Sequence, residues 1–178
     1  DAFAQVGKIV ICGMGGSAIG GELLAAAVAG ECPIPILINR GYDLPACAEG
    51  KGTLVVACSH SGNTEETLTA FALAGQRGAQ RLAVTTGGAL LEKAEEAGVT
   101  AWIFDYASQP RASLGFSLTL LLALASRLGL ARDLNDHVTE AAEVLREQTR
   151  HLHPKTATEE NPAKRLASRL VGRIPVIY

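Results

Sequence analysis

The sequence predicts an α/β fold, a doubly wound, five-stranded parallel sheet flanked by helices. Short apolar runs alternate along the chain with longer segments of helical pattern. Glycine-rich turns lead from several of these runs into the segment that follows, and 19 of the 178 residues are glycine. Hydrophobic residues make up 48% of the chain, which is enough to bury both faces of a parallel sheet.

The five expected strands are short, continuous apolar runs, as strands covered on both faces require. In chain order they are residues 8–12, 34–39, 53–58, 81–85 and 101–104. Helices are expected after the first, third and fourth strands, at residues 17–29, 64–77 and 89–97. Because two parallel strands need a crossover connection, this alternation predicts a parallel sheet.

The apolar run 114–130 follows the last expected strand. Ser117, Thr119 and Arg127 interrupt it. It is also shorter than the roughly 20 residues that a membrane span needs, so we expect a buried helix and no membrane partner. Beyond it the pattern predicts an amphipathic helix at 136–152, a polar linker at 154–161 and another helix at 162–171.

The two ends of the sequence indicate a longer natural chain. The sequence begins without a methionine, and its last residues, 174–178, are typical of the start of another strand. An unpaired strand edge is an unusual place for a domain to end. We therefore expect one domain at 1–153, a linker and helix at 154–171, and the truncated start of a second domain at 172–178.

The composition argues against several classes of protein. The 16 Lys and Arg residues against 18 Asp and Glu give a net charge of −2, without the basic excess of nucleic-acid-binding proteins. The N-terminus lacks the pattern of a signal peptide, so a cytoplasmic location is expected. The four cysteines have no zinc-ligand spacing, and no metal site is expected. Cys12 and Cys58 lie in apolar runs and are expected in the core.

The turn after the first strand, Gly13-Met14-Gly15-Gly16-Ser17-Ala18, leaves two interpretations open. It fits the G-x-G-x-x-A pattern of a dinucleotide-binding turn. That pattern expects an acidic residue about 20 positions on, where this chain has Asn39 and Arg40. Arg40 could accept a 2′-phosphate, so an NADP-binding oxidoreductase remains an alternative. Otherwise the glycines only let helix and sheet pack closely.

The turn after the third strand, Ser59-His60-Ser61-Gly62-Asn63-Thr64, places three hydroxyls and an amide at a helix N-terminus. Backbone N–H groups there are unpaired and carry partial positive charge, so they bind anions. Hydroxyls add donors without charge, which suits the phosphate monoester of a small sugar. Asn63 or Thr64 is expected to cap the helix. Capping explains one polar residue, not four.

With their spacing, these two turns resemble the sugar isomerase (SIS) domain family, and within it the bifunctional phosphoglucose/phosphomannose isomerases. Two further segments carry the resemblance to this subfamily. They are Gln109-Pro110-Arg111-Ala112-Ser113-Leu114-Gly115-Phe116 and Asn161-Pro162-Ala163-Lys164-Arg165-Leu166-Ala167. The resemblance covers nearly the whole chain, and it implies two SIS domains in one polypeptide and a homodimer.

The resemblance implies that the chain binds hexose 6-phosphates and needs no cofactor. The glycine turn would shape the sugar side of the pocket, and the hydroxyls of the second turn would bind the phosphate. These implied substrate-binding residues are Gly15, Gly16, Ser17, Ser59, Ser61 and Thr64.

Arg111 is the catalytic residue that the resemblance implies within this chain. It would face the carbons between which a proton moves when glucose 6-phosphate or mannose 6-phosphate becomes fructose 6-phosphate. A fixed guanidinium suits the oxyanion of a cis-enediolate. In the family, the general base is a Glu, and a His and a Lys open the sugar ring. All three belong to the second SIS domain or beyond, past the end of this sequence. This chain alone is therefore expected to bind substrate without converting it.

Several alternatives stay open at this stage. His60 stands where the family more often has Tyr, and it is expected either to touch substrate or to face solvent. Ser113 and Gly115 stand where relatives often have Ala and Pro, which leaves the placement of Arg111 open. Arg111 could instead pair with a surface carboxylate at a helix start. A single-domain SIS isomerase or sugar-phosphate-sensing regulator would share both turns.

Overall fold

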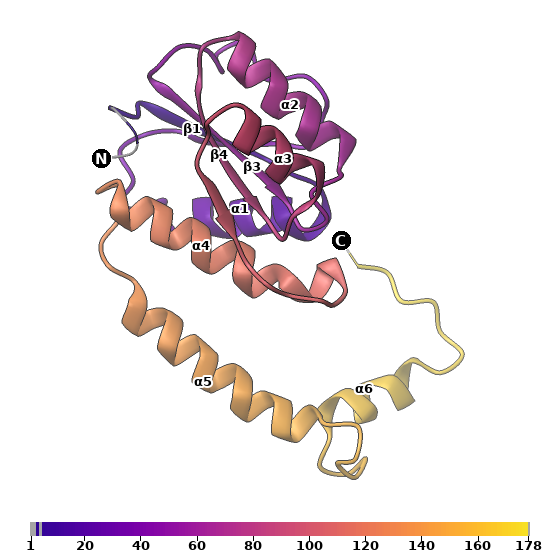
Figure 1. Ribbon diagram of the computed structural model, residues 1–178. Coiled ribbons are helices and arrows are strands. Elements are labelled where there is room, and N and C mark those ends of the chain that lie inside the picture. Colours follow the sequence, from indigo (N-terminus) through magenta and orange to yellow (C-terminus); the bar gives the residue numbers. More distant parts are fainter. Residues whose placement is uncertain (1–2, 4, 178) are drawn as a thin grey trace. The chain divides into compact units, whose positions relative to one another are not determined.

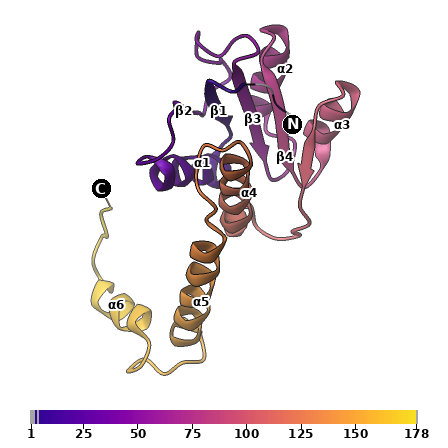
Figure 2. The same ribbon diagram turned by 90° about the vertical axis from the view of Figure 1, so that its left-hand side faces the viewer.

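The computed structural model describes residue 3 and residues 5–177, and it contains a five-stranded parallel sheet in the order β2-β1-β3-β4-β5. The strands are β1 (Lys8–Cys12), β2 (Ile36–Asn39), β3 (Thr53–Ser59), β4 (Gln80–Thr85) and β5 (Ala101–Ile103). Figure 2 shows β2, β1, β3 and β4 side by side in that order. In β1, Val10 lies opposite Leu37 on one side and Val55 on the other. The expected five-stranded parallel α/β sheet is confirmed.

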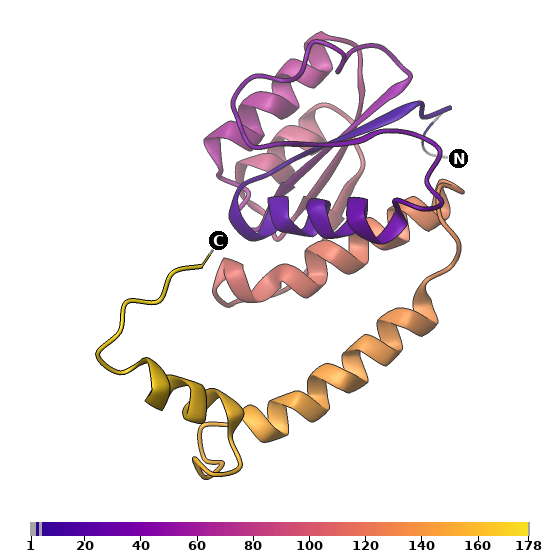
Figure 3. The same cartoon turned by 180° about the vertical axis from the view of Figure 1, so that it is seen from behind.

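Helices cover both faces of the sheet (Figures 1 and 3). On one side, α1 (Gly15–Val28) contacts β1, β2 and β3, and α4 (Leu114–Arg127) packs on α1. On the other side, α2 (Glu65–Gln76) contacts β1, β3 and β4, and α3 (Gly88–Glu96) contacts β4 and β5. All seven residues of the central strand β3 are buried, as a strand between two helix layers should be.

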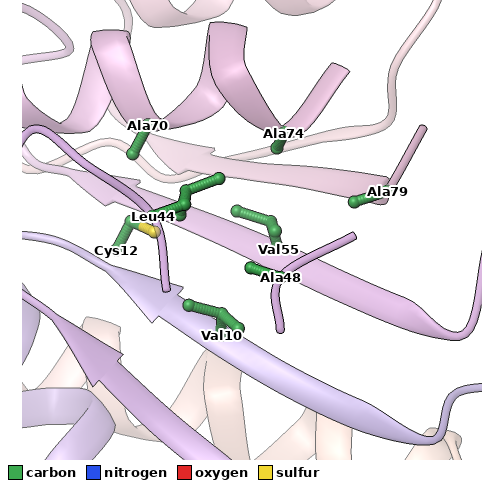
Figure 4. Packing of buried hydrophobic residues seen from close by; sticks show 8 residues of the cluster. All are labelled: Val10, Cys12, Leu44, Ala48, Val55, Ala70, Ala74 and Ala79. Carbon is green, nitrogen blue, oxygen red and sulfur yellow. The ribbon is translucent and has the colours of Figure 1, made fainter. Parts of the chain in front are cut away.

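The core beneath α2 is built from small side chains (Figure 4). Val10 and Val55 of the sheet face Ala70 and Ala74 of the helix, and all four side chains are fully buried. Because alanine has no bulk beyond Cβ, the helix can lie close to the strands. The small side chains thus let α2 pack directly on β1 and β3.

Glycines let α1 fit between the sheet and α4. A Cβ at Gly20 would lie 2.7 Å from the Cβ of Ser117 in α4. A Cβ at Gly21 would lie 2.9 Å from Ile38 and 3.0 Å from Ile11. Distances this short leave no room for a side chain at Gly20 or Gly21 unless the neighbouring atoms move.

The chain divides into two compact units, Asp1–Asp133 and Leu134–Tyr178. The second contains α5 (Asn135–Leu152) and α6 (Pro162–Leu170). Asn161 joins them, because its amide donates to the carbonyl of His153 (3.2 Å) and its Oδ1 caps α6 at the N–H of Lys164 (3.1 Å).

Most expected elements lie within a few residues of the observed ones. The four-residue 3₁₀ helix η1 (Pro110–Ser113) is not expected from the sequence. Residues 174–177 form neither helix nor strand, and residue 178 lies outside the described residues, so the expected strand there is not observed. In the described part of the chain, no helix is long and apolar enough to cross a membrane.

Candidate functional site

The strand order places two turns of the chain next to each other. In the order β2-β1-β3, the connections from β1 and from β3 run in opposite directions along the sheet. Ligands of open α/β sheets bind outside the carboxyl ends of the strands at such a switch point. Gly13 and Met14 connect β1 to α1, whose first turn holds Gly15 and Gly16, and the turn after β3 follows Ser59, the last residue of that strand. A Cβ at Gly13 would lie only 2.9 Å from the carbonyl oxygen of Cys58, so the two strand ends touch.

Ser59 and Thr64 form the inner part of the second turn. Ser59, the last residue of β3, is 2% exposed, and its Oγ lies 2.9 Å from Oγ1 of Thr64. Ser61 is exposed, and its Oγ accepts a hydrogen bond from the N–H of Asn63 (3.2 Å). The three hydroxyls that the sequence analysis singled out therefore lie on one tight turn, two of them in mutual contact.

The N-terminus of α2 has no side-chain cap. Thr64 occupies the capping position, but its hydroxyl makes no capping hydrogen bond and contacts Ser59 instead. The expectation that Asn63 or Thr64 caps α2 through its side chain is therefore wrong. Asn63 Oδ1 accepts from the N–H of Ala89 at the start of α3 (3.1 Å), and its amide donates to the carbonyl of Ser61 (3.1 Å). The first N–H groups of α2 keep their capacity to bind an anion.

The second turn is locked against the turn after β4. Gly62 has a φ of +69°, and a Cβ there would lie 1.7 Å from the carbonyl oxygen of Gly87. Thr86 donates to the carbonyl of His60 through Oγ1 (2.6 Å) and through its N–H (3.3 Å). Thr86 is not among the predicted site residues, although its position directly after β4 indicates that it lies at this edge of the sheet.

The glycine turn brings α1 and η1 together. Gly15 is exposed with a φ of +51°, and Gly16 and Ser17 are half-buried. A Cβ at Gly16 would lie 3.4 Å from the carbonyl oxygen of Pro110 and 3.9 Å from Cα of Arg111. The glycine turn and the segment that carries Arg111 are therefore in backbone contact.

The side chain of Arg111 is exposed. Among the described residues, the ion pairs involve Arg40, Arg150 and His151, and none includes Arg111. The alternative in which Arg111 pairs with a surface carboxylate is therefore not observed. An unpaired guanidinium beside the glycine turn can meet a negative group of a ligand.

His60 contacts the segment that follows β5. It is half-buried, and its Nε2 lies 3.1 Å from the carbonyl oxygen of Tyr106. Its ring lies 6.0 Å from the ring of Phe104 and 6.2 Å from that of Tyr106, between centroids. Neither alternative from the sequence describes this contact.

Arg40 is engaged by α1. Its Nη2 donates to Oε1 of Glu22 at 2.6 Å. The carboxylate of Glu22 offsets the positive charge that a 2′-phosphate would need, which argues against the NADP alternative.

The buried thiols and the carboxylate of Glu65 near the site have structural partners or surroundings. Burial raises the pKa of Cys12 and of Cys58 to about 12, so both thiols stay protonated, as packing residues. Oε2 of Glu65, in the first turn of α2, accepts from the hydroxyl of Tyr42 at 3.3 Å. The carboxylates of Glu66 and Glu65 raise the pKa of Tyr42, which keeps the phenol a donor.

The chain has close relatives among characterised proteins, although no family model matches it. A bifunctional phosphoglucose/phosphomannose isomerase from Caldicellulosiruptor bescii is 46% identical over 174 residues, covering 98% of this chain and 51% of that protein. One from Aquifex aeolicus is 37% identical over 171 residues, covering 96% of this chain and 49% of that protein. The chain thus spans about half the length of the curated relatives it matches.

Solved structures share the fold at low sequence identity. The protein TT0462 from Thermus thermophilus is 24% identical, with a TM-score of 0.66 over 94% of this chain and 42% of that one. The NanR protein of Vibrio vulnificus, solved in complex with ManNAc-6P, is 24% identical, with a TM-score of 0.57 over 79% of this chain and 56% of that one. Together with the sequence relatives, these likenesses identify the chain as a SIS-domain protein related to the bifunctional phosphoglucose/phosphomannose isomerases.

Proposed function

We propose that this chain binds hexose 6-phosphates and supplies the phosphate-binding side of an aldose–ketose isomerase. The reaction would interconvert glucose 6-phosphate or mannose 6-phosphate with fructose 6-phosphate. The observation that carries the proposal is the hydroxyl pair of Ser59 and Thr64 at the uncapped N-terminus of α2, located at the β1/β3 switch point. The names of the curated relatives support the reaction class.

The phosphate would bind at the start of α2. A phosphate monoester carries nearly two negative charges and three acceptor oxygens. The free N–H groups of the helix and the hydroxyls of Ser59, Ser61 and Thr64 supply donors and the positive end of the helix dipole. The carboxylate of Glu65, in the first turn of α2, accepts a hydrogen bond from the hydroxyl of Tyr42.

Arg111 would act on the sugar carbons. Moving a proton between C1 and C2 of the open sugar creates a cis-enediolate, whose oxygen carries developing negative charge. A guanidinium that already stands unpaired beside the glycine turn can stabilise this charge without first breaking an ion pair. Gly15, Gly16 and Ser17 would form the wall that the sugar contacts.

The groups that transfer protons in the reaction would not come from this chain. The family's base and ring-opening residues would come from the half of the relatives that this chain does not match. We therefore expect the purified 178-residue chain to bind fructose 6-phosphate without isomerising it. Turnover by this chain that survives Arg111→Ala would contradict this expectation.

A thermal-shift titration tests the proposed phosphate site. The ligands are fructose 6-phosphate, 5-phosphoarabinonate as an enediolate mimic, inorganic phosphate and NADP⁺. A ligand at 100 times its dissociation constant stabilises the fold by about 2.7 kcal/mol. Thr64→Val removes the hydroxyl that faces Ser59, while Thr69→Val makes the same change on an exposed position of α2.

We expect the sugar phosphates to raise the melting temperature of the chain and of Thr69→Val, with a clearly smaller effect on Thr64→Val. Equal shifts of the melting temperature for both variants would mean that the phosphate does not bind at this turn. Stabilisation by NADP⁺ alone would replace the isomerase proposal with the oxidoreductase alternative.

A further inference from the structure

We propose that His60 is a positioning residue that fixes the Arg111 segment relative to the phosphate turn. The inference rests on the proposed function, because it assigns a role within the same site. It starts from the hydrogen bond between His60 and Tyr106, two residues that are 46 positions apart.

The backbone of His60 is held by two neighbouring elements. Ser59, its neighbour, ends β3, and the carbonyl of His60 accepts two hydrogen bonds from Thr86, at 2.6 and 3.3 Å. The ring therefore projects from a backbone held by β3 and by the turn after β4. A side chain anchored in this way can position a segment whose own hydrogen bonds are local.

The segment that receives this hydrogen bond packs on α1 through η1, but its own hydrogen bonds are local. Within residues 105–113, the hydrogen bonds run from Ser108 to Tyr106 (3.1 Å), from Ala112 to Gln109 (2.9 Å) and from Ser113 to Pro110 (2.6 Å). Each spans two or three residues and cannot fix the segment against the sheet. Among the hydrogen bonds of the described residues, the one between His60 and Tyr106 connects this segment to a distant part of the chain.

An aromatic cluster reinforces the link at both ends of the segment. Phe104 precedes the segment and Phe116 follows it, and their rings stack with centroids 5.1 Å apart. The ring of Tyr106 lies 5.1 Å from that of Phe116, and the ring of His60 adjoins Phe104 and Tyr106 at 6.0 and 6.2 Å. Arg111 lies between Phe104 and Phe116 in the chain, so the stacked rings bring together the two ends of the segment that carries it.

The chemistry of the link identifies the donor. A carbonyl oxygen only accepts, so Nε2 of His60 must carry the proton. The amide of Gln can donate to the same oxygen, whereas Phe retains the ring contacts and cannot donate. His60→Gln and His60→Phe therefore separate the hydrogen bond from the packing.

Two ligands separate the two halves of the site. Inorganic phosphate probes the turn at α2, and 5-phosphoarabinonate adds a carboxylate that would meet Arg111. For His60→Phe we expect 5-phosphoarabinonate to bind about 3- to 10-fold more weakly, the loss of one hydrogen bond. Phosphate should bind within about twofold of the unchanged chain, and His60→Gln should restore most of the 5-phosphoarabinonate affinity. An equal loss for both ligands would mean a merely structural role and would overturn the inference.

Amide hydrogen exchange tests the link without any ligand. We expect the amides of Ser108 and Ala112 to exchange faster in His60→Phe than in the unchanged chain and in His60→Gln. Equal exchange in all three overturns the inference whatever the ligands do. If the exchange difference is present but the unchanged chain binds neither ligand, the proposed function fails while His60 still orders the segment.

Discussion

The charge of Arg111 can be tested separately from the fold, because its side chain is exposed while its backbone packs on Gly16. Arg111→Met keeps much of the side-chain length and removes the charge. We expect the affinity for 5-phosphoarabinonate to fall by about 10-fold or more, the effect of a hydrogen bond to a charged group, and the affinity for phosphate to change little. Isothermal titration calorimetry measures both.

Arg127→Met is the matched control for this variant. Arg127 lies at the other end of α4, where its guanidinium stands 5.5 Å from the centroid of the Trp102 ring. This variant should bind both ligands as the unchanged chain does. If Arg111→Met weakened phosphate as much as 5-phosphoarabinonate, Arg111 would not face the sugar carbons.

The buried thiols predict a loss of stability at high pH. Burial raises the pKa of Cys12 and Cys58 from 9.0 to about 12, so between these values the folded chain holds protons that the unfolded chain releases. The free energy of unfolding should therefore be unaffected by these thiols below about pH 9 and fall above it, by up to about 1.4 kcal/mol per pH unit for each thiol.

Urea unfolding at about pH 8 and pH 10.5 measures this effect. Cys58→Ala should show a smaller fall than the unchanged chain, because it has one fewer thiol with a raised pKa. Cys47→Ala removes an exposed thiol and should leave the fall as it is. Identical falls in all three chains would mean that the buried thiols do not couple folding to pH.

Residue-level contacts were predictable from the sequence only where the partners are close in the chain. Ser59 and Thr64 are five positions apart at a helix start, and the sequence placed both hydroxyls on the same turn. Asn63 and His60 have partners 26 and 46 positions away, in Ala89 and Tyr106. No local signal indicates such partners, so the cap on α2 was predicted wrongly and the contact of His60 was missed.

At the scale of elements, the packing of α1 on α4 depends on Gly20. An added Cβ would lie 2.7 Å from the Cβ of Ser117, and neither atom can rotate away. Gly20→Ala should lower the free energy of unfolding by about 1–3 kcal/mol, although alanine favours the helix itself. Thermal and urea unfolding measure the change.

Two comparisons give this experiment its control. Gly30→Ala, where nothing lies within 4 Å of the added Cβ, should have a small effect. Ser117→Gly removes the opposing Cβ, so combining it with Gly20→Ala should restore part of the lost stability. Purely additive effects would mean that the two helices do not meet at these residues.

The elements themselves were predictable to within a few residues, because strands between two helix layers must be apolar throughout. The central strand β3 is the clearest case, with all seven residues buried. The 3₁₀ helix Pro110–Ser113 is too short to show a periodic pattern. It carries Arg111, so the sequence pointed to the segment proposed for the sugar side of the site without predicting its conformation.

At the scale of the whole molecule, the strand order brings the glycine turn and the hydroxyl turn together at the candidate site. The alternation of strands and helices predicted a parallel sheet, but it did not predict that β1 and β3 are neighbours. That pairing is what brings Gly13 against Cys58 and the glycine turn beside the hydroxyl turn. The sequence identified the turns through their chemistry, whereas their contact depends on long-range pairing.

The division into two units predicts different stabilities for the two parts of the chain. All the strands, the glycine turn and the hydroxyl turn at the start of α2 belong to Asp1–Asp133, so a chain shortened to these residues should unfold cooperatively and bind phosphate like the full one. In the other unit, α5 and α6 have no buried residue, and Leu145 and Leu166 are 61% and 56% exposed.

Most of the stability of a protein helix comes from the packing of its apolar face against other elements rather than from helix propensity. A peptide of residues 134–178 should therefore show little helical circular dichroism and no cooperative melting. A cooperative transition of this peptide would mean that it is an independent domain. Loss of phosphate binding in the shortened chain, with its fold intact, would mean that the second unit contributes to the site.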